Sequence, residues 1–196
     1  MKLYYSPGAC SLADHIALHE AGLAHELVKV DLKAKTTADG GDYTAINPKG
    51  YVPALTLDDA GGTLTENIAI LDYIAGQAPQ LMPQGTLAHT RLLETLAFIS
   101  TELHKSFGPF FQGGGDAEKQ KAADKIAQRL DYLAGNMPGD YLFGDSFTVA
   151  DAYLFVMLMW AKKFELAVPE PLPAYFDRVR ARAGVQGALE MEGLAG

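Results

Sequence analysis

The single cysteine of the chain, Cys10, stands where the first predicted helix begins. It follows Pro7-Gly8-Ala9, so its thiol is expected beside unpaired backbone N–H groups and the positive end of the helix dipole. Such surroundings favour the thiolate and can lower a cysteine pKa from about 8.5 to roughly 3.5–7.5. The alternative is a small buried hydrophobic residue, because Cys10 lacks the Cys-x-x-Cys pairing of a redox motif.

The backbone of Val52 is a second candidate, because it lies between Asn47-Pro48-Lys49-Gly50-Tyr51 and Pro53, just before a predicted strand. A cis bond before Pro53 would turn the N–H and C=O of Val52 outward as pairing groups for an extended ligand. Only about 5–6% of X–Pro bonds are cis, so the residues by themselves favour trans.

Thr65-Glu66-Asn67 ends a predicted strand and opens a helix. A hydroxyl, a carboxylate and an amide at a helix N-terminus can bind a ligand that carries both an ammonium and a carboxylate. The anion would meet the backbone N–H groups and the cation would meet Glu66. Simple N-capping is the commoner use of such residues.

His104 and Lys105 lie near the end of a helix predicted over residues 92–103. Two cationic or proton-handling groups near a thiol would hold it ionised or position a substrate. By themselves they more often form a solvated helix end whose charge complements the dipole.

His15 and His19 are one helical turn apart, a spacing that can bind a metal ion. Asp14 and Glu20 lie on adjacent faces, and no third ligand of suitable type is evident. We therefore expect surface histidines and no metal.

The elements that position these residues differ between the two halves of the chain. The first half has β-prone runs at residues 2–5, 26–30, 54–57 and 63–65, and helical patterns at 10–21 and 68–76. The predicted order of elements is βαβ, then an irregular stretch, then ββα. The sequence Asp-Asp-Ala-Gly-Gly between the last two runs is a hairpin signal.

The second half has helical spacing throughout. The stretch after Thr148 is apolar on all sides, as expected for the helix at the centre of a bundle, and Thr148 with Asp151 forms a capping box. Two prolines and a glycine within Pro79–Gly85 break any periodic element. We therefore expect domains at 1–78 and 88–196, joined by a linker at 79–87.

Composition excludes several classes of protein. The 196 residues carry 16 Lys+Arg against 24 Asp+Glu, a net charge of −8, so phosphate backbones and anionic lipid surfaces would repel the chain. We expect neither a nucleic-acid nor a membrane partner. The longest apolar run, residues 152–161, is too short to cross a bilayer, and the N-terminus turns polar too early for a signal peptide. A cytoplasmic protein is expected.

Together these residues resemble the glutathione transferases, specifically the bacterial beta class. Five segments in order carry the resemblance, and they extend over most of the chain: Met1-Lys-Leu-Tyr-Tyr-Ser-Pro-Gly-Ala-Cys10-Ser-Leu, Asn47-Pro-Lys-Gly-Tyr-Val-Pro-Ala-Leu55, Leu64-Thr-Glu66, Thr101-Glu-Leu-His104-Lys105-Ser-Phe107 and Phe147-Thr-Val-Ala-Asp151-Ala-Tyr-Leu-Phe155. The resemblance implies an α/β thioredoxin-like N-terminal domain followed by an all-α helical C-terminal domain.

The resemblance also implies roles for single residues. Val52 would pair its backbone with the cysteinyl part of glutathione, with Pro53 cis. Glu66 and Asn67 would hold the γ-glutamyl end, and Lys35 would meet the glycyl carboxylate. Cys10, His104 and Lys105 would lie near the sulfur.

The activity implied is conjugation of the glutathione thiolate to small hydrophobic electrophiles in a homodimer, with thiol–disulfide exchange at Cys10 as a second activity. A glutathione-dependent reductase or dehalogenase and a non-catalytic module of the same fold are the alternatives. Relatives have an asparagine seven residues before the histidine, thought to reach the partner subunit's glutathione, where this chain has Ala97. Aromatic candidates for the electrophile pocket, which could equally be core residues, are Phe107, Phe110, Phe111, Trp160 and Phe164.

Overall fold

The first half of the chain forms a five-stranded sheet with two helices. The computed structural model describes residues 1–58 and 62–195. The elements of this half are β1 (Lys2–Tyr5), α1 (Ser11–Glu20), β2 (Glu26–Asp31), β3 (Thr36–Thr37), η1 (Tyr43–Ala45), β4 (Ala54–Thr56), β5 (Thr63–Thr65) and α2 (Asn67–Gln77).

The sheet has the order β3-β2-β1-β4-β5, in which β1 and β2 are parallel and the other neighbours are antiparallel. The four expected strands are confirmed, and so is the antiparallel pairing of β4 with β5. The middle of the predicted turn, residues 59–61, lies outside the described residues. The short strand β3 was not predicted, because two threonines alone give no periodic signal. The βαβ and ββα order of a thioredoxin-like domain is confirmed.

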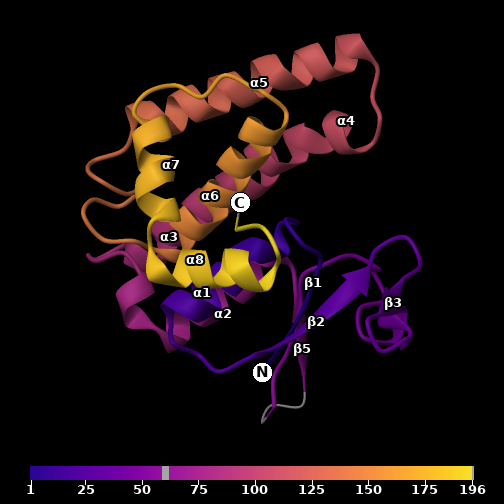
Figure 1. Cartoon of the computed structure of the whole chain (residues 1–196). Coiled ribbons are helices and arrows are strands. Elements are labelled where there is room, and N and C mark those ends of the chain that lie inside the picture. The colour runs from indigo at the N-terminus through magenta and orange to yellow at the C-terminus, as the bar shows by residue number, and fades with distance from the viewer. Residues whose placement is uncertain (59–61, 196) are drawn as a thin grey trace.

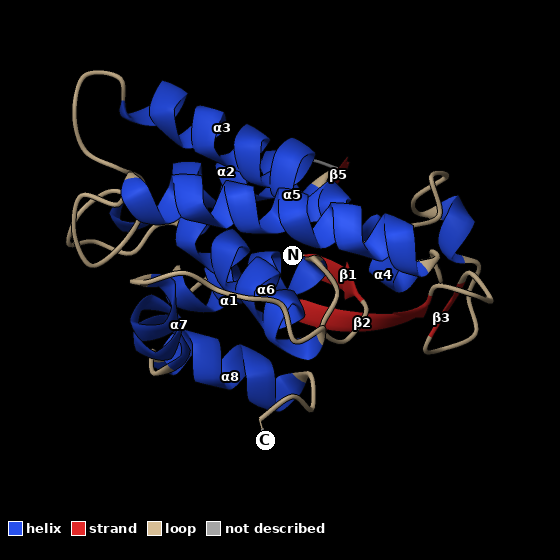
Figure 2. Ribbon diagram, turned by 90° about the horizontal axis from the view of Figure 1, so that it is seen from above, coloured by secondary structure: helices blue, strands red, loops and turns tan. Residues whose placement is uncertain are grey.

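The second half is helical, as expected, and lies above the sheet domain in Figure 1. Its elements are α3 (Ala88–Phe98), η3 (Ile99–Leu103), η4 (His104–Phe107), α4 (Gly108–Phe111), α5 (Asp116–Gly135), α6 (Val149–Lys163), α7 (Leu172–Arg180) and α8 (Ala183–Met191). Between α2 and α3 the structure has the single 3₁₀ turn η2 (Pro79–Leu81). In Figure 2, which looks down on the molecule, helices cover most of the view and β1, β2 and β3 are visible at the right. None of the helices in the described part of the chain is long and apolar enough to cross a membrane.

Helix α6 is the centre of the bundle, as its sequence predicts. All residues from Val149 to Leu158 are buried. The predicted capping box is present, because the Asp151 carboxylate accepts hydrogen bonds from the backbone N–H and the hydroxyl of Thr148, both at 2.8 Å. Asp151 also accepts from the Leu142 N–H at 2.9 Å and from the Tyr175 hydroxyl at 3.0 Å, so this one carboxylate joins three segments of the helical half.

The helix predicted over residues 92–103 changes its winding near its end. The α-helical part stops at Phe98, and η3 is a π-helical turn that leads into the 3₁₀ turn η4. Side-chain hydroxyls compete for backbone carbonyls here: Thr101 donates to the Ala97 carbonyl at 2.9 Å, and Ser106 donates to that of Glu102 at 2.7 Å. The altered winding sets the direction in which His104 leaves the backbone.

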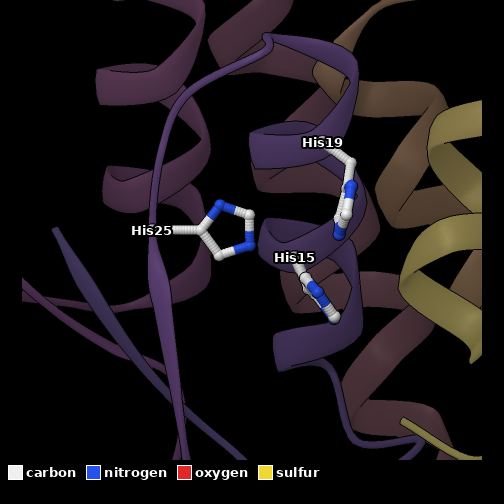
Figure 3. A group of neighbouring side chains, drawn as sticks. All are labelled: His15, His19 and His25. Atoms are coloured by element: carbon white, nitrogen blue, oxygen red, sulfur yellow. The ribbon is translucent and has the colours of Figure 1, made fainter. Parts of the chain in front are cut away.

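Helix α1 is covered on several sides, which corrects one expectation. It packs against α2, α6 and α8, and every residue from Ser11 to Leu18 is buried. The prediction that His15 is a surface residue is therefore wrong: its ring is fully buried, and that of His19 is half-buried. The prediction that no third ligand lies nearby is also wrong, because His25, from the segment before β2, reaches the same place (Figure 3).

Candidate functional site

A cavity of about 720 Å³ lies between loops of the sheet domain and the helical half. Seven of the eight predicted site residues line it: Cys10, Val52, Pro53, Glu66, Asn67, His104 and Lys105. The eighth, Lys35, is not among the lining residues. Its ammonium donates to the Gly50 carbonyl at 2.5 Å, next to Tyr51, which does line the cavity.

The Cys10 thiol points into a largely buried environment at the start of α1. It donates to the Val52 carbonyl oxygen across 3.6 Å. Burial raises the pKa of this thiol to about 12, and the nearby Asp14 carboxylate adds to the rise, while the backbone N–H groups of Cys10 and Ser11 oppose it. The N–H groups at the helix N-terminus act in the expected direction, but desolvation of the thiolate outweighs them, so the expected thiolate is not favoured. In the free protein, Cys10 is a neutral hydrogen-bond donor.

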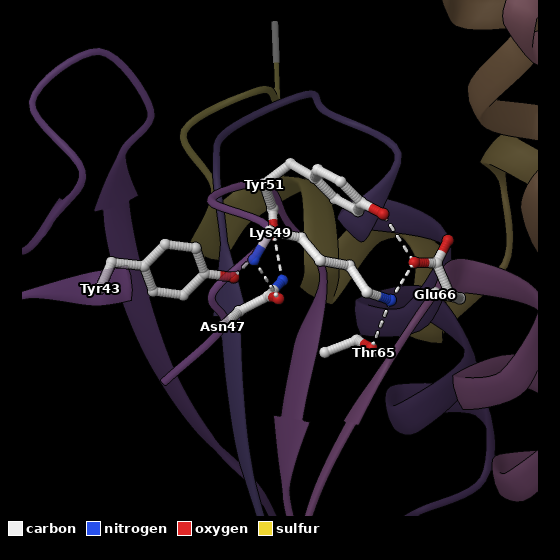
Figure 4. A network of polar contacts seen from close by, with 6 residues as sticks. All are labelled: Tyr43, Asn47, Lys49, Tyr51, Thr65 and Glu66. Carbon is white, nitrogen blue, oxygen red and sulfur yellow. Dashed lines mark hydrogen bonds and ion pairs between the residues drawn. The ribbon is translucent and has the colours of Figure 1, made fainter. Parts of the chain in front are cut away.

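The peptide bond between Val52 and Pro53 is cis. The family resemblance implies this isomer, whereas the residues by themselves favour trans. The preceding carbonyl, that of Tyr51, accepts hydrogen bonds from the Asn47 amide at 2.7 Å and the Tyr43 hydroxyl at 2.9 Å (Figure 4). Asn47 and Tyr43 are both fully buried, so the loop that carries Val52 is fixed from beneath. The Val52 carbonyl is not wholly free for a ligand, because the Cys10 thiol already donates to it.

Glu66 directs its carboxylate away from the helix that it precedes. No side chain caps α2, so the N-capping alternative does not describe Glu66. One carboxylate oxygen accepts from the Lys49 ammonium and from the Tyr51 hydroxyl, the latter at 2.6 Å (Figure 4). These hydrogen bonds lower the pKa of Glu66, which is ionised at neutral pH. Its φ of 76° is a left-handed conformation that is uncommon for glutamate.

Asn67, the first residue of α2, turns its side chain toward α1. With its amide nitrogen on that side, it donates to the Cys10 carbonyl at 3.1 Å and to Asp14 Oδ2 at 2.6 Å. Asp14 is fully buried, and burial raises the pKa of its carboxyl well above the usual value. Asn67 therefore ties the helix that bears Cys10 to the helix that follows Glu66.

His104 is neutral at physiological pH, so of the two expected kinds of group, cationic or proton-handling, it can only be the second. Burial, with a smaller contribution from Lys105, lowers the pKa of its imidazole to about 4. Its Nδ1 lies 2.6 Å from the Tyr153 hydroxyl. Burial raises the pKa of Tyr153, so this phenol keeps its proton. His104 and Tyr153 are thus a neutral hydrogen-bonded pair on the cavity wall.

Comparison with known proteins agrees with this site. The chain matches the family model for the glutathione S-transferase N-terminal domain at residues 1–76 and the model for the glutathione S-transferase C-terminal domain at residues 95–183. The chain belongs to the glutathione S-transferase family. It is 44% identical to the glutathione S-transferase GstA of Escherichia coli O157:H7, over 99% of this chain and 100% of that protein.

Solved structures give the same result. A sphingomonad glutathione S-transferase complexed with glutathione is 46% identical, with a TM-score of 0.90 and coverage of 100% of both chains. The bacterial beta-class glutathione S-transferase of Sphingomonas chungbukensis is also 46% identical, with a TM-score of 0.89, and the match covers 99% of this chain and 100% of that one. The protein is therefore a glutathione S-transferase closely related to the beta class, with the expected two-part fold.

The aromatic candidates of this transferase divide into two groups. Phe111 and Trp160 line the cavity, and their rings meet edge to face with centroids 4.8 Å apart. The Trp160 indole N–H donates to the Gly8 carbonyl at 2.8 Å, which fixes its position. Phe107 is fully buried in the core. The ring of Phe110 stacks on that of Phe164, with centroids 5.0 Å apart, and neither Phe110 nor Phe164 lines the cavity.

Three residues in or next to the cavity wall were not predicted from the sequence. Tyr153 lies in the all-apolar stretch of α6, where nothing marks it out from the surrounding core residues. The side chains of Lys49 and Tyr51 donate to the Glu66 carboxylate, whereas the sequence predicts a role only for the backbone of this segment. No sequence signal marks them, because the chain turns at Gly50, whose φ is 71°, and only the folded loop brings both side chains to Glu66.

Proposed function

We propose that this transferase conjugates the thiolate of reduced glutathione to small hydrophobic electrophiles in the cavity between its two halves. One observation carries the proposal: polar groups suited to a peptide, from Cys10 to Glu66, share a single cavity with the apolar surfaces of Phe111 and Trp160. A peptide thiol held on the first side would have its sulfur next to an apolar co-substrate on the second.

Glutathione would lie with its γ-glutamyl end at α2. The ionised Glu66 would receive the ammonium, and the backbone N–H groups at the start of α2 would receive the carboxylate. The contribution of Asn67 would come from its backbone, since its side chain faces Asp14 and Cys10. The Val52 backbone would pair with the cysteinyl residue, Lys35 would attract the glycyl carboxylate, and Lys105 would lie near the sulfur.

The sulfur of glutathione would be the nucleophile. The neutral Cys10 thiol can donate to it only by leaving the Val52 carbonyl. His104, whose Nδ1 lies against Tyr153, would donate from Nε2. Two donors that favour the thiolate over the thiol lower the barrier to attack, because charge is already concentrated on sulfur. The reaction forms a bond from sulfur to the electrophilic carbon, the thiol proton goes to solvent, and the leaving group departs.

The structure weakens the case for the alternative chemistry at Cys10. Disulfide exchange and reductive dehalogenation by the protein's own sulfur both need a thiolate, and a pKa of about 12 leaves little of it at neutral pH. The charged residues Glu66 and Lys105 in the cavity wall argue against a non-catalytic module, which has no need of a peptide-binding site.

A chlorinated dinitroaromatic substrate tests the proposal. We expect glutathione-dependent release of chloride with equimolar thioether product, above the rate without enzyme. Reduction of a glutathione mixed disulfide without thioether formation would support the reductase instead. Glutathione binding by calorimetry with neither reaction, across a panel of apolar electrophiles, would support the binding module.

The active assembly would be a homodimer. Two-fold dimers are the commonest closed assembly, and the resemblance that led to the family implies a dimer. Ala97 is exposed on α3. An alanine side chain cannot donate a hydrogen bond, so any contact from this position to the glutathione of the other subunit would have to come from neighbouring residues.

A further inference from the structure

Three of the five histidines meet at the end of α1 away from Cys10 (Figure 3). His15 and His19 lie on successive turns of α1, and His25 reaches them from the segment just before β2. One nitrogen from each ring lies within 4.8 Å of one from each of the others. None of the three is among the residues that line the glutathione cavity, so this cluster is separate from the transferase site.

Hydrogen bonds fix which nitrogen of two rings can bind a ligand. The Nδ1 of His25 lies 2.8 Å from the Leu23 carbonyl, which can only accept, so Nδ1 carries the proton. The Nδ1 of His15 lies 2.9 Å from Glu192 Oε1, a carboxylate that likewise accepts. With the proton on Nδ1, the nitrogen of each ring that can bind a ligand is Nε2. A histidine held at Nδ1 by a carboxylate or carbonyl is the usual arrangement around a metal ligand.

The Nε2 atoms of all three rings are buried and lack a hydrogen-bond partner within the described residues. Three such atoms in one place call for an explanation, because a buried polar atom without a partner costs roughly 1–3 kcal/mol.

The spacing of the rings fits tetrahedral coordination. With metal–nitrogen distances of about 2.0–2.1 Å, three imidazoles on a tetrahedral ion have ring centroids roughly 5 Å apart. The observed centroid distances are 4.9 Å for His15 and His19, 5.4 Å for His15 and His25, and 5.2 Å for His19 and His25.

The C-terminal segment closes the cluster. Gly187 of α8 faces His19, and a Cβ at this position would lie 3.4 Å from its Nδ1, so the glycine allows α8 to approach the ring. Next to this contact, Arg182 forms an ion pair with Glu20 at 2.5 Å, which fixes the end of α1 against the start of α8. Glu192 then follows α8 with its side chain buried against His15.

We propose that His15, His19 and His25 form a binding site for a divalent first-row transition metal ion, with Zn²⁺ as the expected occupant. The three Nε2 atoms supply the protein ligands, and a water molecule completes the tetrahedron. Glu192 and the Leu23 carbonyl orient two of the rings. The bound ion would fasten α1 to the segment just before β2, and the contact of His15 with Glu192 connects this site to the segment after α8. This inference is independent of the conjugation chemistry.

Titration with Co²⁺ tests the site, because tetrahedral Co²⁺ absorbs strongly in the visible range. The chain is used without a polyhistidine tag and with Cys10→Ala, which removes the thiol as a ligand. We expect one Co²⁺ per chain with tetrahedral absorption, displaced by Zn²⁺. A stoichiometry near zero, or octahedral Co²⁺ only, would overturn the proposal and leave the three rings as a packed aromatic cluster.

Variants identify the ligands. His25→Gln and His19→Gln change partly exposed positions and should abolish the visible band, while Glu192→Gln should weaken binding by about 10–100-fold. His89→Gln is the matched control, since this histidine is exposed on α3 and bonded to Asp72.

Circular dichroism checks that each variant folds, and conjugating activity should be unchanged in His25→Gln. Loss of the band in His89→Gln, or its retention in His25→Gln, would refute the assignment. A melting temperature that Zn²⁺ raises in the parent chain but not in His25→Gln would support it.

Discussion

The Cys10 thiol donates a hydrogen bond to the Val52 carbonyl oxygen across 3.6 Å, which joins the start of α1 to the residue before the cis proline. A thiol in this position serves as a donor, and its raised pKa keeps it protonated. Glutathione conjugation needs Cys10 only as a hydrogen-bond donor, whereas thiol–disulfide exchange needs its thiolate.

Cys10→Ala should retain measurable conjugation of glutathione to a chlorinated aromatic, with a partial fall in kcat, because the attacking sulfur belongs to glutathione. Cys10→Ser, which keeps a donor for the Val52 carbonyl, should retain more. Both variants should lose any disulfide exchange completely, since the chain has one cysteine. Conjugation and disulfide reduction are measured on the same preparations. Complete loss of conjugation in both variants would mean that Cys10 is itself the nucleophile.

Alkylation of Cys10 should reveal the protonated thiol directly. Its rate of reaction with iodoacetamide in the free protein should keep rising with pH beyond pH 9, because the pKa is raised to about 12. Mass spectrometry of the intact chain measures the rate, and Cys10→Ala is the blank. A rate that stops rising near pH 7 would show that the thiol has a low pKa, and that the helix N-terminus outweighs desolvation in setting it.

Glu66→Ala should raise the KM for glutathione far more than it lowers kcat. The contact to the γ-glutamyl ammonium is made equally in the ground state and the transition state, so its loss affects binding. Steady-state kinetics at varied glutathione measure both constants. Glu94→Ala, which removes an exposed carboxylate paired with Arg91, is the control and should change neither. A large fall in kcat at unchanged KM would assign Glu66 a different role.

The low pKa of His104 should be visible in the stability of the fold. Its folded pKa of about 4 lies below the usual 6.5, so between these values the unfolded chain binds more protons than the folded one. The free energy of unfolding therefore falls as pH decreases through this window. His104→Gln removes this titration, so its free energy of unfolding should fall less than that of the wild type from pH 6.5 to pH 4. Urea unfolding at several pH values measures both, and parallel curves would contradict a buried neutral imidazole.

Thr148→Ala should lower the free energy of unfolding by about 0.5–2 kcal/mol, because it removes the hydroxyl that caps α6 against Asp151. Urea denaturation measures the change. Thr90→Ala, at an exposed site within α3, is the matched control and should stay within about 0.5 kcal/mol of the wild type. Equal effects of the two substitutions would show that the capping box adds nothing to stability.

Sedimentation at micromolar concentration should give about twice the mass of one chain, as a two-fold dimer requires. Conjugating activity is assayed on the same sample across a dilution series. A monomer that keeps full activity would show that neither subunit needs the other.

Local sequence patterns were enough to predict most strands and helices and seven of the residues that line the cavity. The strands β1, β2, β4 and β5 and the buried helix α6 follow from periodicity, which is a property of neighbouring residues. Five short motifs, in order, pointed to the family and so to Cys10, Glu66 and His104, whose placement on one cavity the structure then showed.

Only the tertiary structure decided the protonation states and the partners. The pKa of Cys10 and of His104 depends on desolvation by segments far away in the chain, and this outweighs the local helix dipole on which the sequence argument relied. The same reason explains His15: its own helix suggests a surface position, but α6 and α8 cover it, and its neighbours His25 and Glu192 arrive from beyond the helix. Burial and long-range contacts are set by packing between elements, which no local spacing records.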